Sequence, residues 1–461
     1  MFNAFLCCRR GFGQSLGEGT ACRAAGRKWL SIQFLALAGM ALCQPDARAD
    51  WPSFRGPRND GHVTAPGDGK DIGLPLQWSD TTNVKWKVEI PFRGWSTPAV
   101  MGGQVWLTTA TVEGNDFYAI CADAETGKLL FNERVFHCDE PESLYNAKEA
   151  NTYATPSPGI EPGRVYVHFG SYGTACLDTK TFKVLWERKD LPCRHYRGPA
   201  SSPFLYENLL ILTMDGVDVQ YLIALDKKTG QTVWKTNRSV AWNDEDDPTP
   251  MVREGDRRKA HSTPVLIEVN GEPQLLSAGA KAAYAYDPRT GKELWRVHHG
   301  AWSAAPMALY QDGLVFFITG FGGKNELLAV RADGHGDVTD THIAWRTDSM
   351  VPRTASPILV DGLLYAVTDD GVVTCREPKT GEQIWKGSIG GKYASSPIYG
   401  DGRIYFCSKQ GKTTVIKPGR ALEVLATNQL GDGFMASPAV SGKALYLRTK
   451  TQLVRVEEES K

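Results

Sequence analysis

Side chains suited to stacking and hydrogen bonding recur just upstream of a repeated proline in this sequence. They stand a few residues before each proline and are Trp95, Tyr153, Arg197, His261, Trp302, Arg353, Tyr393 and Phe434. Aromatic rings offer flat faces for stacking, while Arg and His add donors and cation–π contacts. If the copies close into a ring, these residues form a ligand-binding ring around its centre. The alternative is that they pack together and plug that centre.

Two lysines extend this candidate site. Lys281 and Lys409 fall in turns that are expected to open on the same side of the molecule as the aromatic positions. Their ammonium groups would favour an anionic ligand, although charged turn residues are more often only solvated.

Sequence signatures of catalysis are absent. The chain contains no Gly-x-Ser-x-Gly elbow, no His-Glu-x-x-His motif, no phosphate-binding Gly-x-x-x-x-Gly-Lys loop and no Cys-x-x-Cys-His haem site. We therefore expect no catalytic residues and no metal ligands. Basic and acidic residues balance at 52 each, so no charge excess favours nucleic acid as a partner.

The candidate residues are positioned by a repeat that spans most of the chain. The recurring prolines are Pro98, Pro156, Pro203, Pro264, Pro306, Pro357, Pro397 and Pro438. A strand, an Asp-Gly turn and a second strand follow in the clearest copies, then Asp or Glu, two residues, Thr-Gly and a run ending in Trp. Each copy therefore predicts four short strands, and a period near 40 residues with insertions is typical of a β-propeller.

The last copy, from Ala436 onward, has only about three strands. Residues 84–88, upstream of the first copy, carry the missing outer-strand pattern. We therefore predict an all-β, eight-bladed β-propeller of four-stranded antiparallel blades, in which the N-terminal strand completes the C-terminal blade. Closure of this kind removes exposed sheet edges, and the propeller is expected to form a single domain over residues 50–461.

The first 49 residues are expected to be a leader. Arg27 and Lys28 precede an apolar stretch over residues 29–43, and residues 47–49 (Ala-Arg-Ala) form a signal-peptidase site. Cleavage after Ala49 would place the mature chain in the periplasm or outside the cell.

The apolar stretch of this leader is too short to span a bilayer, so no transmembrane helix is expected in the mature chain. Lipidation at Cys43 is an alternative, but Leu42 stands where a lipobox requires a small residue.

Two cysteines lie outside the repeated strands. Cys138 and Cys193 each stand seven residues after the outer-strand aromatic of consecutive copies. Equivalent loops of neighbouring blades lie side by side, so an oxidising compartment would favour a Cys138–Cys193 disulfide. The alternative is two free thiols.

The repeat resembles that of the pyrroloquinoline-quinone (PQQ) dehydrogenase superfamily, and within it the bacterial PQQ-like propellers related to the outer-membrane assembly lipoprotein BamB. The resemblance covers residues 75–458. It rests on the blade pattern, on residues 51–57 (WPSFRGP) and on residues 280–287 (AKAAYAYD). One fold serves many functions, so membership does not specify an activity.

The resemblance to quinoproteins implies PQQ with Ca²⁺, held between a Trp and a disulfide of adjacent cysteines. Trp302 is the candidate stacking residue here, but the mature chain has no adjacent cysteines, since Cys7-Cys8 lies in the leader. An oxidoreductase is therefore the alternative, and binding without catalysis is the main expectation.

The resemblance to BamB implies a scaffold for outer-membrane protein assembly, which is a further alternative. The expected partner is a cell-envelope protein, a small molecule or a glycan bound at the mouth of the central channel.

Overall fold

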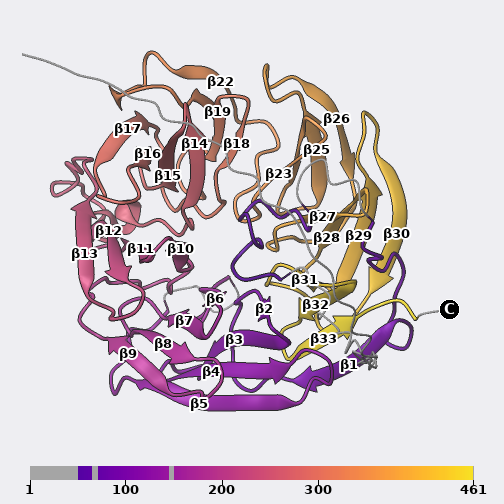
Figure 1. Cartoon of the computed structure of the whole chain (residues 1–461). Helices are drawn as coiled ribbons and strands as arrows, with labels where there is room; N and C mark the ends of the chain where they lie inside the picture. Colours follow the sequence, from indigo (N-terminus) through magenta and orange to yellow (C-terminus); the bar gives the residue numbers. More distant parts are fainter. Residues whose placement is uncertain (1–49, 65–70, 145–149, 460–461) are drawn as a thin grey trace, which may run out of the picture. The chain divides into compact units, whose positions relative to one another are not determined.

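The computed structural model describes residues 50–64, 71–144 and 150–459, and its architecture is an eight-bladed β-propeller (Figure 1). Each blade is an antiparallel sheet whose innermost strand faces a central channel. This confirms the predicted fold class. The expected signal peptide, its cleavage site and Cys43 lie outside the described residues, apart from Asp50 after the site.

The blades follow one another along the chain, each from its innermost strand outward. Blades one to four are β2 (Ala99–Met101), β3 (Gln104–Ala110), β4 (Asp116–Asp123), β5 (Leu129–His137); β6 (Gly159–Glu161), β7 (Arg164–His168), β8 (Thr174–Asp178), β9 (Val184–Arg188); β10 (Phe204–Tyr206), β11 (Leu209–Asp215), β12 (Gln220–Asp226), β13 (Thr232–Asn237); β14 (Val265–Val269), β15 (Glu272–Ala278), β16 (Ala282–Tyr286), β17 (Glu293–His298).

Blades five to eight continue the pattern with β18 (Leu309–Gln311), β19 (Leu314–Ile318), β20 (Leu327–Arg331), β22 (Ile343–Thr347); β23 (Ile358–Val360), β24 (Leu363–Val367), β25 (Val372–Arg376), β26 (Gln383–Ser388); β27 (Ile398–Gly400), β28 (Arg403–Cys407), β29 (Lys412–Lys417), β30 (Glu423–Gln429); β31 (Ala439–Ser441), β32 (Ala444–Arg448), β33 (Gln452–Val456), β1 (Val84–Glu89).

Three short elements interrupt this pattern. The two-residue β21 (Gly336–Asp337) pairs in parallel with β17 and widens blade four. Between blades three and four lie helix α1 (Pro250–Arg253) and the 3-10 turn η1 (Asp256–Arg258). Among the described residues, no helix is long and apolar enough to cross a membrane.

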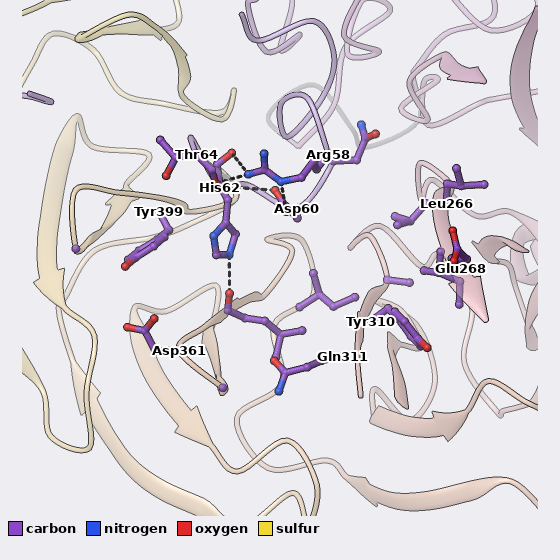
Figure 2. A pocket seen from close by; sticks show the side chains of 18 of the residues that line it. Arg58, Asp60, His62, Thr64, Leu266, Glu268, Tyr310, Gln311, Asp361 and Tyr399 are labelled. Atoms are coloured by element: carbon purple, nitrogen blue, oxygen red, sulfur yellow. Dashed lines mark hydrogen bonds and ion pairs between the residues drawn. The ribbon is translucent and has the colours of Figure 1, made fainter. Parts of the chain in front are cut away.

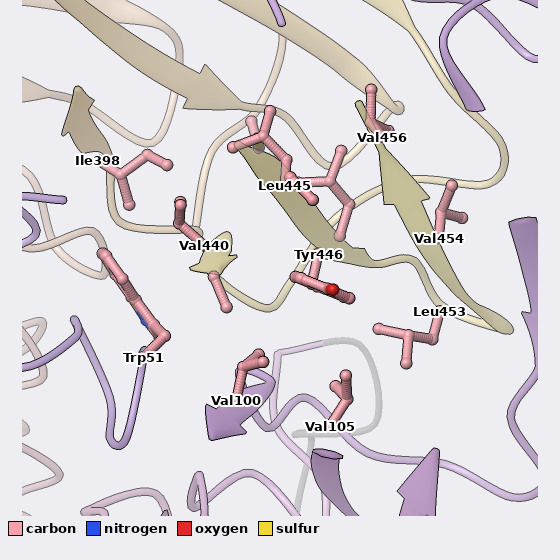
Figure 3. Packing of buried hydrophobic residues seen from close by; sticks show 14 of the residues in the cluster. Trp51, Val100, Val105, Ile398, Val440, Leu445, Tyr446, Leu453, Val454 and Val456 are labelled. Carbon is pink, nitrogen blue, oxygen red and sulfur yellow. The ribbon is translucent and has the colours of Figure 1, made fainter. Parts of the chain in front are cut away.

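The chain ends meet in blade eight, as predicted. Strand β1 pairs antiparallel with β33, with Val88 opposite Leu453. The seam buries one continuous hydrophobic cluster, in which Trp51 packs with Val100 of blade one, Ile398 of blade seven and Val440 of blade eight (Figure 3). Closure therefore depends on apolar packing as well as on strand pairing.

Adjacent blades are joined at the inner rim by serine and threonine hydroxyl groups. At the equivalent position of seven blades, a hydroxyl oxygen accepts the backbone N–H of the same position in the preceding blade, at 2.9–3.1 Å. The residues are Thr97, Ser157, Ser202, Thr263, Ser356, Ser396 and Ser437. These bonds explain why a hydroxyl side chain recurs before the proline.

This rim also corrects the register of the repeat in two blades. In blade two the equivalent residue is Ser157, so the repeated proline is Pro158 and not Pro156. In blade five the position is held by Met307, whose N–H donates to Ser356. Methionine has no hydroxyl, so the circle is interrupted between Thr263 and Met307.

The outer rim is joined by tryptophans of the outermost strands. Trp186 packs on Gly230 in the Thr-Gly turn of the next blade, and its Nε1–H donates to the carbonyl of Lys227 at 2.9 Å. Trp86, Trp234 and Trp345 repeat both contacts on their next blades. The glycine is required because it has a positive φ and the indole lies where a Cβ would be.

Blades one, four and seven lack this contact between a tryptophan and a turn glycine, and each departure has a structural reason. Phe131 takes the Trp place in blade one, and it stacks at 5.2 Å on Phe182, which replaces the turn glycine of blade two. Blade five has no Thr-Gly turn, and Trp295 of blade four is instead fully buried and donates to Gln274 of its own blade. Blade eight has no such hairpin because two chain ends meet there, so blade seven needs no tryptophan.

We predict that Ser396→Ala destabilises the protein by about 1–3 kcal/mol, because the buried N–H of Ser356 loses its acceptor. Chemical unfolding would measure the change. Ser395→Ala is the matched control, since that buried hydroxyl makes only a 3.5 Å contact. Equal effects of the two substitutions would contradict the role of the inner rim.

We also predict that Gly230→Ala is more destabilising than Gly163→Ala. Both glycines have positive φ, but an added Cβ at Gly230 would lie 2.7 Å from the Trp186 ring, whereas nothing lies within 4 Å at Gly163. The extra cost is about 1–3 kcal/mol. Thermal unfolding of both variants tests this, and indistinguishable midpoints would argue against tryptophan docking.

Candidate functional site

The channel mouth is the face at which the chain enters each innermost strand. A cavity of about 110 Å³ lies there, and all eight blades contribute to its wall. Among the predicted ring residues, Trp95 of blade one and His261 of blade four line it together. The Nε1–H of Trp95 and the Nδ1 of His261 are buried and have no hydrogen-bond partner among the described residues. Two polar groups are thus available at a narrow mouth.

The floor of this cavity is formed by the segment 51–64, whose residue Phe54 reaches the cavity. The segment crosses the channel by pairing with innermost strands. Trp51 and Val100 exchange two backbone hydrogen bonds of 2.8 Å, and the peptide groups of Tyr399 bond Gly61 and Val63 at 2.9 Å. The segment therefore lies within the channel.

The buried side chain of Arg55 holds this segment in place through hydrogen bonds. Its guanidinium is 1% exposed and donates to the carbonyls of Asp60 at 2.7 Å and Pro357 at 2.9 Å. Burial lowers the pKa of Arg55 to about 10. From the sequence, residues 51–57 were interpreted only as a signature of the family. The signal that could have indicated their place in the channel is a run with Trp, Phe and Arg that belongs to none of the eight repeats.

Three predicted ring residues belong to the packing between strands and loops. Tyr153 is 4% exposed and its hydroxyl donates to the Glu142 carbonyl at 2.7 Å. Tyr393 and Phe434 are almost fully buried. Each forms an isolated β-bridge to the residue that follows the second strand of its own blade, Ser408 and Thr449 respectively. The expectation of one continuous aromatic ring at the mouth therefore does not match their positions.

Trp302 is half-buried and already in contact with other residues. The Arg257 guanidinium lies 5.1 Å from its ring centroid, and Gly322 and Gly323 pack against the indole. Trp302 also exchanges two backbone hydrogen bonds with Gly322 at 3.0 and 3.1 Å. Part of the indole is thus already in contact with the protein itself.

The remaining predicted residues lie on mouth loops. Arg353 is exposed and covers the ring of Phe321 at 5.1 Å, and Arg197 pairs with Asp256 at 3.5 Å. Lys281 donates to the Trp242 carbonyl at 3.3 Å. Lys409 is partly exposed, and its backbone N–H donates to Lys392. These cations are spread around the face and do not converge on one point.

The expected disulfide is not formed in the structure. Cys138 and Cys193 are both free thiols. They pack in two different hydrophobic clusters, Cys138 beside Phe136 in blade one and Cys193 beside Leu191 after blade two. Burial raises the pKa of the Cys193 thiol well above its ordinary value, so it is an unreactive core residue.

The side chains present do not fit PQQ with Ca²⁺. The described residues contain no adjacent cysteines and no group of three or more His, Cys, Asp or Glu side chains placed to hold a metal ion. The one candidate stacking residue, Trp302, already contacts Arg257, Gly322 and Gly323. No catalytic step is therefore assigned to this cofactor.

A second, larger pocket opens on the opposite face, where the innermost hairpins turn. Its volume is about 890 Å³. The segment 58–64 forms one wall, and the innermost strands of blades four to seven form the others (Figure 2). His62 donates from Nε2 to the Leu359 carbonyl at 2.6 Å, and Arg58 pairs with Asp60 at 3.0 Å. No sequence motif indicated this pocket.

Two buried histidines near the mouth make the stability of the protein depend on pH. Burial lowers the pKa of His195 to about 4 and of His261 to about 3. The unfolded chain therefore binds protons between about pH 6.5 and 4 that the native protein does not, so stability falls as the pH is lowered through this range.

We expect His195→Phe to make the stability of the protein less dependent on pH between about 6.5 and 4, because one proton uptake site of the unfolded state is lost. Unfolding curves across this range measure the slope. Pro199→Ala, which alters packing beside the same glycine as His195, should lower stability without changing the slope. Parallel curves for the wild type and His195→Phe would contradict the assignment.

Comparison with solved structures shows the same fold at low identity. BamB from Moraxella catarrhalis superposes with a TM-score of 0.56 and 13% identity, covering 82% of this chain and 98% of that protein. A quinohemoprotein alcohol dehydrogenase from Comamonas testosteroni gives a TM-score of 0.62 and 12% identity over 90% of this chain and 81% of that one.

Among curated proteins, the chain is similar to a tetrathionate hydrolase from Acidithiobacillus ferrooxidans, with 23% identity over 309 residues. The match covers 64% of this chain and spans 54%, about half, of that protein's length. A family model described as "Outer membrane protein assembly factor BamB" matches residues 77–237 and 218–461. The chain therefore belongs to the BamB-like family of PQQ-repeat β-propellers.

Proposed function

We propose that this protein is a non-catalytic propeller of the periplasm or the extracellular space that binds a polypeptide at its channel mouth. The observation that carries the proposal is a mouth face that has exposed aromatic side chains on its loops and a central cavity too small for a cofactor or a glycan. Pockets that enclose small ligands have volumes of roughly 300–1,000 Å³. The mouth cavity has about 110 Å³ and accommodates a few waters or one side chain.

The loops around this cavity offer contacts for a protein surface. Phe321 is 59% exposed and is overlaid by Arg353, and Phe92 is 46% exposed and stacks on Tyr118 at 4.3 Å. Aromatic residues and arginine are enriched in protein interfaces because they contribute large contact areas and donors. Trp95 and His261 could then bond a carbonyl or carboxylate that a partner inserts into the cavity.

The family supports a protein partner in the cell envelope. Its description names outer-membrane protein assembly, and a scaffold in such assembly is the corresponding role for this chain. The quinoprotein alternative finds no support in the residues around Trp302.

Photo-crosslinking tests this proposal. A benzoylphenylalanine placed at Phe321 or Phe92 should yield protein adducts in cells. The same group at Val424, which is 49% exposed on the outer strand of blade seven, is the matched control and should yield few. Equal adducts at all three positions, or none at the mouth, would refute binding at this face.

A separate titration tests the quinone alternative. We expect no calcium-dependent heat when the purified protein is titrated with PQQ, because neither the adjacent cysteines nor a metal-holding cluster is present in the described chain. Micromolar binding in Ca²⁺ that is lost in chelator would overturn the non-catalytic assignment and call for a substrate screen.

A further inference from the structure

The innermost strand of blade four differs from its counterparts in length and in its partners. Strand β14 has five residues, whereas the other innermost strands have three. Its side chains alternate between buried and exposed, and Leu266 and Glu268 point into the large pocket of the hairpin face. Figure 2 shows both residues across the pocket from His62 and Tyr399.

The register of β14 determines where its peptide groups point. Val269 and Glu272 flank the two-residue turn Asn270-Gly271 and so form a hydrogen-bonded pair. Bonded and non-bonded pairs alternate along an antiparallel ladder. Leu266 and Glu268 therefore occupy non-bonded positions, and their N–H and C=O groups point away from β15 into the channel. Pro273, which has no N–H, lies opposite Glu268, as this register requires.

These channel-side groups have no partner among the described residues. The segment 51–64 bonds the equivalent peptide groups of Val100, Ile160 and Tyr399 in blades one, two and seven, and the Leu359 carbonyl in blade six. Within the described chain, none of its bonds reach Leu266 or Glu268 in blade four, or Tyr310 in blade five. Blades one, two, six and seven thus bond the segment inside the channel, whereas β14 presents an inner edge that has no partner in the described chain.

The charge of the pocket selects the kind of strand that would fit. Glu268 and Asp361 line it without an ion-pair partner in the described chain, and both side chains are exposed. The positive charge of Arg58 is engaged by Asp60. Burial lowers the pKa of His62, which favours its neutral form. An incoming segment with Lys or Arg would therefore be favoured over an acidic one.

From this geometry we propose that the inner edge of β14 binds an extended, positively charged polypeptide segment as an added strand in the hairpin-face pocket. Main-chain bonds to Leu266 and Glu268 supply the affinity, and alternate side chains of the segment meet the acidic wall. The site lies on the face opposite the mouth, so it is independent of the function proposed above.

The first test uses a fluorescent peptide of about eight residues with alternating Lys and Val, and a matched peptide with alternating Glu and Val. Anisotropy titration of the full protein should show binding of the basic peptide only. Leu266→Pro removes the channel-side N–H without breaking the β15 ladder, since proline is tolerated on an edge strand. It should weaken binding about tenfold or more, whereas Leu266→Ala should have a smaller effect.

Equal binding of both peptides would overturn the charge preference, and wild-type affinity of Leu266→Pro would overturn strand addition. Hydrogen exchange on the wild-type protein provides a readout that does not depend on the folding of a variant. The basic peptide should protect the amides of Leu266 and Glu268, and protection elsewhere would contradict the site. Phe321→Ala should leave this binding unchanged, which separates it from binding at the mouth.

Discussion

Each blade meets its neighbour along an inner rim where a hydroxyl oxygen accepts the backbone N–H of the preceding blade. A propeller has no common core, so its rigidity comes from contacts between successive sheets. The hydroxyl contacts are short and buried, and they are repeated almost around the circle, from Thr97 through Ser202 and Ser356 back to Ser437. The outer tryptophans add a second set of contacts at larger radius. The two sets together hold the innermost strands in fixed positions, which determines the width of the channel and of both pockets.

The segment 51–64 hydrogen-bonds to the inner edges of innermost strands. It pairs with Val100 and Tyr399, and its buried Arg55 binds carbonyl groups of Asp60 and Pro357. A buried guanidinium is costly unless its donors are satisfied, so these bonds specify one path for the segment. Different parts of the segment thus contribute to the two faces, since Phe54 lines the mouth cavity and Arg58 and His62 line the hairpin-face pocket.

The two faces differ in what they can hold. The mouth is narrow and its polar groups are few, so contacts there depend on exposed loop residues such as Phe321 and Phe92. The hairpin face has a pocket of about 890 Å³ with an acidic wall and, on β14, peptide groups that have no partner among the described residues. Membership of a family described by an outer-membrane assembly factor accords with protein binding. The contacts that Trp302 already makes with Arg257, Gly322 and Gly323 leave less of its ring for a stacked quinone.

The sequence by itself determined the blade repeat, the number of blades and the pairing of the two chain ends, because these depend on local turn chemistry and on alternation along single strands. Only the tertiary structure decided which recurrent aromatics face the channel. Trp95 stands three residues before its proline, whereas Tyr393 and Phe434 stand four residues before theirs and bridge to the turn after the second strand of their own blades. A shift of one position redirects a side chain from channel to core. The path of the segment 51–64 and the free edge of β14 were likewise decided in three dimensions, because both rest on backbone contacts between residues far apart in the chain.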